Sequence, residues 1–218
     1  MFIGNDIVDL TDPATRLDAL NDSFTRDSFT DDEYDAIFAD RDPGVALWSH
    51  WAAKQSVIKA LVKAAGETSI DPRSLRVDFY NRVGGTRMSG SVEYAGHRID
   101  VDVVHISGAV HAVAMLGTWP HRRAIVCDVV AVPGDSNDAG GLARGALCSS
   151  VADRIDCPLD ELCIVGADAP RIERDGIGLG IDVSLSHHGR LAAFAHTLPR
   201  DAARGSVAGS RPRLRRAR

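Results

Sequence analysis

Two short segments carry residues whose types and spacing could bind a metal ion and a phosphate. Residues 51–59 have a helical pattern, which predicts that Trp51, Lys54 and Gln55 share a face and that Lys59 follows Gln55 one turn later. Residues 2–9 form a short apolar run, typical of a strand, that carries Asp6. A carboxylate on a strand end, opposite an amide and an ammonium on a helix, suits a hard cation and a diphosphate. The cation takes oxygen ligands, and the lysine takes a phosphate oxygen.

Together these segments resemble the motifs of the 4'-phosphopantetheinyl transferases. Gly4-Asn5-Asp6 is similar to the family's Gly-x-Asp, and residues 51–59 are similar to its Trp-x-x-Lys-Glu-x-x-x-Lys. Residues 26–33 resemble its Arg-x-x-Phe-Thr-x-x-Glu segment, between the other two motifs. Residues 183–190, followed by an apolar run over 191–195, resemble its Ser-x-Ser-His segment. These enzymes move the phosphopantetheine arm of coenzyme A onto a serine of a carrier protein.

The resemblance implies a role for each matched residue of the first half. Asp6 would bind Mg²⁺, with Mn²⁺ as an alternative, and so anchor the coenzyme A diphosphate. Lys59 would contact the phosphates and stabilise the departing 3',5'-ADP. Lys54 would do similar work, pair with a carboxylate, or simply lie on a solvated helix face. Gln55 departs from the family, which has Glu here, but its carbonyl oxygen could still bind the metal.

The amide at position 55 leaves two interpretations open. Glutamine lacks the negative charge of Glu and cannot usefully accept a proton, so the metal should bind more weakly and the general base must be Asp6, a water or a neighbouring acid. In the first interpretation, the chain is an active transferase that uses one of these bases. Alternatively it is an impaired family member that binds coenzyme A or a carrier protein without transfer.

The second half supplies candidates for binding the phosphates of coenzyme A. His187 matches the family's histidine, and Ser184 and Ser186 lie on one face of the same predicted strand. Arg190 is a further phosphate ligand candidate. The structural alternative for His187 is a hydrogen-bonded turn histidine. The resemblance implies that the carrier is an apo acyl or peptidyl carrier protein.

The elements that must position these residues indicate an α+β fold. Helices are predicted from Asp12-Pro13, from Thr30 by a capping-box pattern, over 45–65 with a stop at Gly66, and over 142–155; strands are predicted over 2–9, 75–80, 89–94, 98–105, 111–116, 124–131, 161–167, 182–186 and 191–196. The halves look like weak copies, because 124–133 echoes 2–13 and the segment around 104–114 echoes that around 185–195. We therefore expect two similar lobes forming a pseudodimer, each an antiparallel sheet packed against a long helix, with the site between them.

The expected boundaries are a first lobe over 1–120, a second lobe over 121–198 and a flexible, Arg-rich tail over 199–218. The first lobe holds Asp6 and the Lys54/Gln55/Lys59 helix, and the second holds the Ser-Leu-Ser-His segment. Family members are either single-lobe chains that form trimers or two-lobe monomers, and 218 residues fit the monomer.

Composition narrows the remaining classes of function. The net charge is −5, yet residues 200–218 hold seven Arg and one Asp, so a single-stranded nucleic-acid binder acting through the tail is a rival interpretation. No apolar run reaches a transmembrane length, and no P-loop, dinucleotide fingerprint or nucleophile elbow occurs. The four cysteines lack zinc-site spacing and are expected to be buried free thiols of a cytoplasmic protein.

Overall fold

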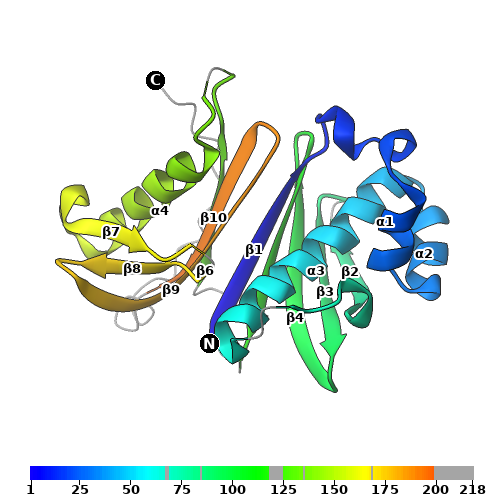
Figure 1. Cartoon of the computed structure of the whole chain (residues 1–218), viewed down its shortest axis with the longest axis horizontal. Coiled ribbons are helices and arrows are strands. Elements are labelled where there is room, and N and C mark those ends of the chain that lie inside the picture. Colours follow the sequence, from blue (N-terminus) through cyan, green and yellow to red (C-terminus); the bar gives the residue numbers. More distant parts are fainter. Residues whose placement is uncertain (67–68, 84, 118–124, 135, 168, 199–218) are drawn as a thin grey trace.

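Two antiparallel sheets of five strands each form the framework of the chain, with a long helix on each (Figure 1). The computed structural model describes residues 1–66, 69–83, 85–117, 125–134, 136–167 and 169–198. The expected boundary between the lobes at 120/121 and the Arg-rich tail therefore lie outside the described residues. No described helix is both long and apolar enough to cross a membrane.

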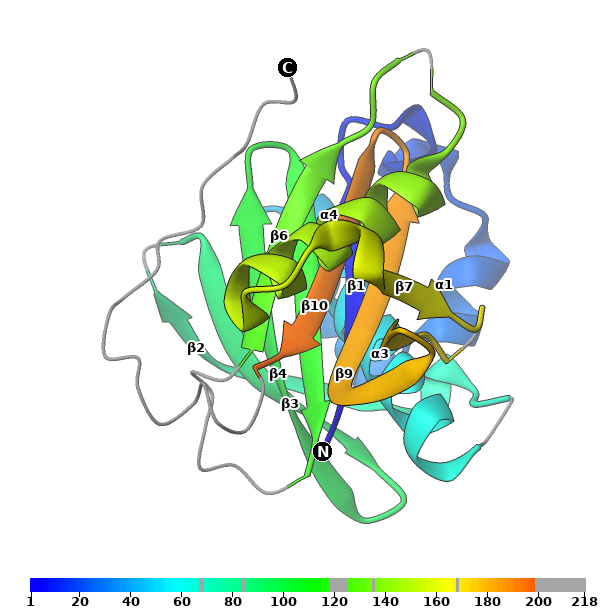
Figure 2. The same cartoon turned by 90° about the vertical axis from the view of Figure 1, so that its left-hand side faces the viewer.

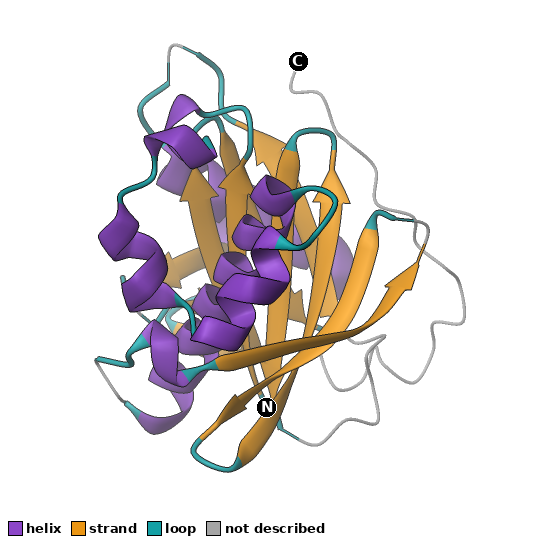
Figure 3. Ribbon diagram, turned by 90° about the vertical axis from the view of Figure 1, so that its right-hand side faces the viewer, coloured by secondary structure: helices purple, strands orange, loops and turns teal. Residues whose placement is uncertain are grey.

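The first lobe contains one sheet with the strand order β1-β5-β4-β3-β2. Its elements are β1 (Phe2–Asp9), η1 (Pro13–Thr15), η2 (Leu17–Ala19), α1 (Asp22–Ser28), α2 (Asp31–Phe38), α3 (Pro43–Ala65), η3 (Pro72–Ser74), β2 (Arg76–Val83), β3 (Arg87–Tyr94), β4 (His97–Ile106) and β5 (Ala109–Leu116). The helices of this lobe gather on one side of its sheet (Figure 3).

The second lobe repeats this order as β6-β10-β9-β8-β7. Its elements are β6 (Ile125–Ala131), α4 (Ala139–Ile155), η5 (Leu159–Glu161), β7 (Leu162–Val165), β8 (Arg171–Arg174), β9 (Ile177–His188) and β10 (Leu191–Thr197). In Figure 2, where the second lobe faces the viewer, α4 lies across the strands of the second sheet.

Strand register confirms the expected pseudodimer. In the first lobe Asp6 lies opposite Ala112, and in the second lobe Asp128 lies opposite Phe194. The pairing Asp102–Val113 between β4 and β5 returns 82 positions later as Ser184–Ala195 between β9 and β10. The same shift of 82 positions relates Ala112, the partner of Asp6, to Phe194, the partner of Asp128. Asp128 is therefore the counterpart of Asp6 in the second lobe.

Local signals explain where the helices begin and end. The predicted capping box is present, since Thr30 and Glu33 exchange hydrogen bonds at the start of α2. Gly66 ends α3 in the left-handed conformation, with φ 68°. The helix expected from Asp12-Pro13 is wrong: only two short 3₁₀ turns form, because Arg16 and Leu20 adopt extended backbone angles. Neither α1 nor β8 was predicted.

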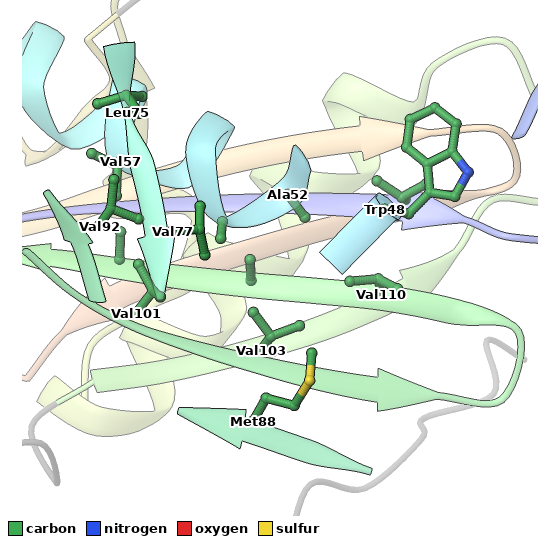
Figure 4. Close-up of a cluster of buried hydrophobic side chains, with 14 of the residues drawn as sticks. Trp48, Ala52, Val57, Leu75, Val77, Met88, Val92, Val101, Val103 and Val110 are labelled. Atoms are coloured by element: carbon green, nitrogen blue, oxygen red, sulfur yellow. The ribbon is translucent and has the colours of Figure 1, made fainter. Parts of the chain in front are cut away.

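The core of the first lobe lies between α3 and the sheet (Figure 4). Its members include Trp48, Ala52 and Val57 of α3 and a row of strand residues, Val77, Met88, Val92, Val101, Val103 and Val110. A smaller core in the second lobe packs Leu147 and Val151 of α4 against Val183 and Phe194. The four cysteines are free, but Cys127 and Cys163 are exposed, so the expectation that all are buried is wrong.

Candidate active site between the two lobes

The site begins with a close contact between β1 and α3. A Cβ atom added to Gly4 would lie 1.8 Å from the Ser56 carbonyl oxygen and 2.9 Å from the Ala60 nitrogen. Only glycine lets the strand backbone approach the helix this closely. The contact explains the glycine of the Gly-x-Asp motif, because it brings Lys59 of α3 within reach of Asp6 of β1.

Asp6 and Lys59 form an ion pair at this contact. The Lys59 Nζ atom lies 2.7 Å from Asp6 Oδ1 and 3.0 Å from the Asn5 carbonyl oxygen. The side chains are 14% exposed for Asp6 and 34% exposed for Lys59. Burial raises the pKa of Asp6 above its usual value, although Lys59 and, more weakly, His188 act in the opposite direction. The structure therefore holds a partly accessible ammonium in a set position, with one N–H left for an incoming anion.

Gln55 lies one helical turn before Lys59 and is half-buried. Within the described part of the chain, no hydrogen bond engages its amide. Because α3 runs antiparallel to β1 here, with Lys63 near Ile3 and Lys59 at Asp6, Gln55 lies toward the Asp9 end of the strand. Its carbonyl oxygen is therefore not engaged by any group that the described residues supply.

Lys54 occupies the core of the first lobe and not the site. Its side chain is 0% exposed, and its ammonium donates to Glu33 Oε2 at 2.7 Å and to the carbonyl oxygens of Ser28 at 2.8 Å and Pro72 at 3.0 Å. It also lies over the ring of Phe29. All three ammonium hydrogens are used, so the expectation that Lys54 binds coenzyme A does not fit its surroundings. Its pairing with a carboxylate, the second option, is what the structure has.

The second lobe approaches the site through β9, which lies along the free edge of β1. We call this contact the inter-lobe seam; it joins Ile3, Asn5 and Asp9 of β1 to Asp182, Ser184, Ser186 and His188 of β9. Asn5 donates from its backbone nitrogen to Ser184 Oγ and from its side-chain amide to Ser186 Oγ, both at 2.9 Å. In Figure 1 the strands of the two lobes meet here, beside β10.

Of the two neighbouring histidines, His188 faces the first lobe. Its Nδ1 atom accepts a hydrogen bond from the Asp9 backbone at 3.2 Å, whereas His187 is exposed. Arg190 meets the same aspartate, because its backbone nitrogen donates to Asp9 Oδ2 at 3.0 Å, and its side chain is exposed. Ser184 and Ser186 are buried in the seam. The β9–β10 turn thus brings an imidazole near Asp6 and a guanidinium near Asp9.

Asp9 anchors this turn. Both of its carboxylate oxygens accept hydrogen bonds, Oδ1 from Thr11 and Oδ2 from Arg190. Burial alone would raise the pKa of Asp9, but these hydrogen bonds outweigh it and the pKa is lowered. Gly189 is required beside Asp9, because its φ is +54° and an added Cβ would lie 2.7 Å from Asp9 Oδ2.

Sequence reasoning missed the seam residues Asn5, Asp182 and His188, and also Lys63. A signal existed, since the polar residues Asp182, Ser184, Ser186 and His188 recur at every second position and so share one face of a strand. Two surface hollows of about 380 and 410 Å³ lie elsewhere, and neither includes Asp6, Gln55 or Lys59.

A comparison with protein families decides what kind of site this is. The model of the 4'-phosphopantetheinyl transferase superfamily matches residues 2–113, which include Gly4, Asp6 and Lys59. The chain belongs to this superfamily. The match covers the half that contains α3 and the Asp6–Lys59 pair, and the strand register relates the rest of the chain to it as a second copy.

The other comparisons add little to the superfamily assignment. Among 22 matching chains of solved structures is holo-[acyl-carrier-protein] synthase (AcpS) of Thermotoga maritima. That structure is 12% identical in sequence, with 81% of this chain and 84% of that chain covered and a TM-score of 0.38. None of the curated proteins compared with this chain matches it.

The two lobes differ at the helix positions that correspond to Gln55 and Lys59. The helices α3 and α4 both end at a left-handed residue, Gly66 and Asp156. Aligning these ends places Gly145 at the position of Gln55 and Ser149 at that of Lys59. By this alignment α4 has neither an amide at the position of Gln55 nor an ammonium at that of Lys59.

The donors around Asp6 fit a divalent cation that also takes ligands from a substrate. The described residues contain no group of three or more His, Cys, Asp or Glu side chains arranged to hold a metal. One Asp6 oxygen is engaged by Lys59, which leaves the other oxygen and the Gln55 carbonyl. Mg²⁺ commonly binds one or two carboxylates together with substrate phosphates and water. These residues suit that pattern better than a metal site made by protein alone.

Proposed function

We propose that the chain transfers the 4'-phosphopantetheine arm of coenzyme A to a serine of an apo acyl or peptidyl carrier protein and releases 3',5'-ADP. The observation that carries the proposal is the Asp6–Lys59 pair, held at 2.7 Å on the first lobe. Membership in the superfamily supports the reaction type.

In this proposal Lys59 neutralises charge on the diphosphate. The carrier serine oxygen attacks the β-phosphorus, and the bond from that phosphorus to the oxygen of 3',5'-ADP breaks. The N–H that Lys59 does not use within the protein then stabilises the departing phosphate, as fixed cations do in phosphoryl transfer. Arg190 is the proposed ligand of the remaining phosphates. The expected ligands Ser186 and His187 do not fit the site, because Ser186 is buried in the seam against the Asn5 amide and His187 lies on the face of β9 that points away from β1.

We expect the serine proton to go to Asp6, a water or a neighbouring acid, because the Gln55 amide cannot usefully accept it. The second oxygen of Asp6 and the Gln55 carbonyl would hold Mg²⁺ or Mn²⁺ that arrives with coenzyme A. When bound, that ion adds positive charge beside the diphosphate. Gln55 contributes an oxygen but no charge, so we expect the free protein to bind Mg²⁺ weakly.

The second candidate function is binding without transfer. The amide at position 55, where the family has an acid, favours it, because glutamine brings neither negative charge nor a proton acceptor. Such a protein would hold coenzyme A or a carrier protein at the same seam.

The proposal also includes the setting of the protein. We place it in the cytoplasm, where coenzyme A and apo carrier proteins occur together, and we propose that it acts as a monomer. The support for a monomer is that both lobes of the site come from one chain. The Arg-rich tail is not assigned to nucleic acid, so deleting residues 200–218 should leave transfer intact.

Intact-mass spectrometry of apo carrier proteins after incubation with coenzyme A and Mg²⁺ tests the function. Wild type, Gln55→Glu, Asp6→Ala and Lys59→Met are compared, with Asp128→Ala as the matched control at the equivalent strand position of the second lobe. The proposal predicts a phosphopantetheine mass gain with wild type and Asp128→Ala, and none with Asp6→Ala.

The variant at position 55 separates the two candidate functions. A mass gain with Gln55→Glu but not with wild type would support binding without transfer. No gain with either, across several carriers, would contradict the transferase, and calorimetry with coenzyme A would then decide whether the chain binds it without transfer.

A further inference from the structure

The seam has one constant register. The backbone nitrogens of Ile3, Asn5 and Asp9 donate to side chains of β9 that lie 179 positions further along the chain, Asp182, Ser184 and His188. On its other side β1 pairs with β5. Side-chain acceptors therefore satisfy the free edge of β1 in place of another strand, and a slip by one residue would turn those acceptors to the opposite face.

A buried ion pair closes one end of this seam. Lys63 Nζ lies 2.8 and 3.0 Å from the two Asp182 oxygens and 2.9 Å from the Val183 carbonyl oxygen. The side chains are 6% exposed for Lys63 and 17% exposed for Asp182. Burial lowers the pKa of Lys63, and the attraction to Asp182 opposes that change. The same carboxylate accepts the backbone N–H of Ile3.

Lys63 lies one turn beyond Lys59 on α3, so a single helix holds both lobes. Lys59 reaches Asp6 of its own lobe, and Lys63 reaches β9 of the other. The counterpart of Lys63 on α4 is Asp153, by the alignment of the helix ends. The pair is therefore not a general feature of the repeated fold and occurs on the side that carries the site.

We propose that Lys63 and Asp182 are positioning residues, which hold β9 in register with β1 and so set the β9–β10 turn against Asp6 and Lys59. This inference rests on the proposed function, because it assigns the turn to coenzyme A. Neither residue touches the reacting atoms. Their effect passes through β9, whose far end carries Ser186 and His188, and Arg190 of the turn that follows.

The test compares Lys63→Met, Lys63→Arg, and the double variant Lys63→Met/Asp182→Asn in the full chain. Coenzyme A affinity is measured by calorimetry, kcat and KM by the carrier assay, and exchange of the amides of residues 2–9 by hydrogen–deuterium exchange. Misplacing a binding group by about 1 Å can cost up to about a hundredfold, so Lys63→Met should weaken coenzyme A binding and raise its KM by about ten- to a hundredfold. Exchange of the β1 amides should become faster, and Lys63→Arg should restore both properties.

The double variant separates positioning from stability. It removes the unpaired buried carboxylate, so thermal stability should recover, while coenzyme A binding should stay weak because nothing ties α3 to β9. Recovery of both thermal stability and coenzyme A affinity would show that the pair is merely structural and would overturn the proposal. Glu161→Gln is the control, since it breaks an ion pair with Arg174 inside the second lobe and should leave affinity unchanged.

Failure of the inference differs from failure of the proposed function. If wild type does not bind coenzyme A, the function is wrong, and amide exchange still reports whether Lys63 holds the seam. If wild type binds coenzyme A and Lys63→Met changes neither affinity nor β1 exchange, the function stands and the positioning role is refuted.

Discussion

Replacing Gly4 with alanine should separate β1 from α3 and break the site. The added methyl would lie 1.8 Å from the Ser56 carbonyl oxygen, whereas non-bonded contacts are optimal near 3.5 Å, so the two backbones must part by roughly 1.7 Å. Both neighbours in that contact are backbone atoms, which cannot rotate away. Overpacking of this kind costs about 3 kcal/mol, which for a chain of this size lowers Tm by roughly 6–12 °C.

The same displacement should reduce catalysis. Moving α3 by this amount would take the Lys59 ammonium from 2.7 Å to about 4 Å from Asp6, beyond hydrogen-bond range. We expect transfer to fall by about a hundredfold. The assays are thermal denaturation followed by circular dichroism and phosphopantetheine transfer followed by intact mass, both on the same preparation.

Gly140→Ala is the matched control for Gly4→Ala. Gly140 lies in the first turn of α4, and an added Cβ meets nothing within 4 Å, so the change should be neutral or stabilise by up to about 1 kcal/mol. If Gly4→Ala kept its Tm within about 2 °C of wild type and retained full transfer, the close strand–helix contact would not be what positions Lys59.

Three further predictions concern the core, the turn and the response to acid. Lys54→Met should cost about 3–5 kcal/mol in urea denaturation, because it leaves a buried carboxylate without its partner. Gly189→Ala places a methyl 2.7 Å from the Asp9 carboxylate and should weaken coenzyme A binding about tenfold in calorimetry. Burial lowers the pKa of His111 and of His196 to about 4, so both are neutral in the fold and charged in the acid-unfolded chain. Their contribution to the free energy of unfolding is complete above about pH 6.5 and is lost as pH falls toward 4, with a slope of about 1.4 kcal/mol per pH unit for each histidine. In denaturation curves measured across this range, His111→Asn should halve the summed slope of the two histidines.

Each of these predictions has an outcome that would contradict it. Unchanged urea stability in Lys54→Met would mean that the pair with Glu33 adds nothing net. Wild-type affinity in Gly189→Ala would mean that the β9–β10 turn is not part of the coenzyme A site. A His111→Asn variant with the same acid dependence as wild type would show that this imidazole is not held neutral by burial.

The sequence predicted much of the fold because its signals are local. The capping box of Thr30 and Glu33 and the left-handed glycine at position 66 depend on neighbours within one turn, and both are present. The alternation of apolar residues predicted most strands, and the echo between the halves predicted the repeated lobe. The short strand Arg171–Arg174 escaped prediction because four residues carry too little periodic signal.

Tertiary packing alone decided which charged groups belong to the site. Lys54 and Gln55 are adjacent on one helix, and periodicity cannot tell which of them is covered. Glu33 of α2, which approaches from another part of the chain, places Lys54 in the core, while Gly4 lets Lys59 reach Asp6.

Tertiary packing also decides which of the two neighbouring histidines faces the first lobe. His187 and His188 point to opposite faces of β9, and only the docking of β1 selects His188. The sequence by itself determined the superfamily motifs, the elements that carry them and the repeat, because these depend on residue type and spacing along the chain. The structure decided the seam, the Lys63–Asp182 pair and the partner of each lysine, because these depend on contacts between residues up to 181 positions apart.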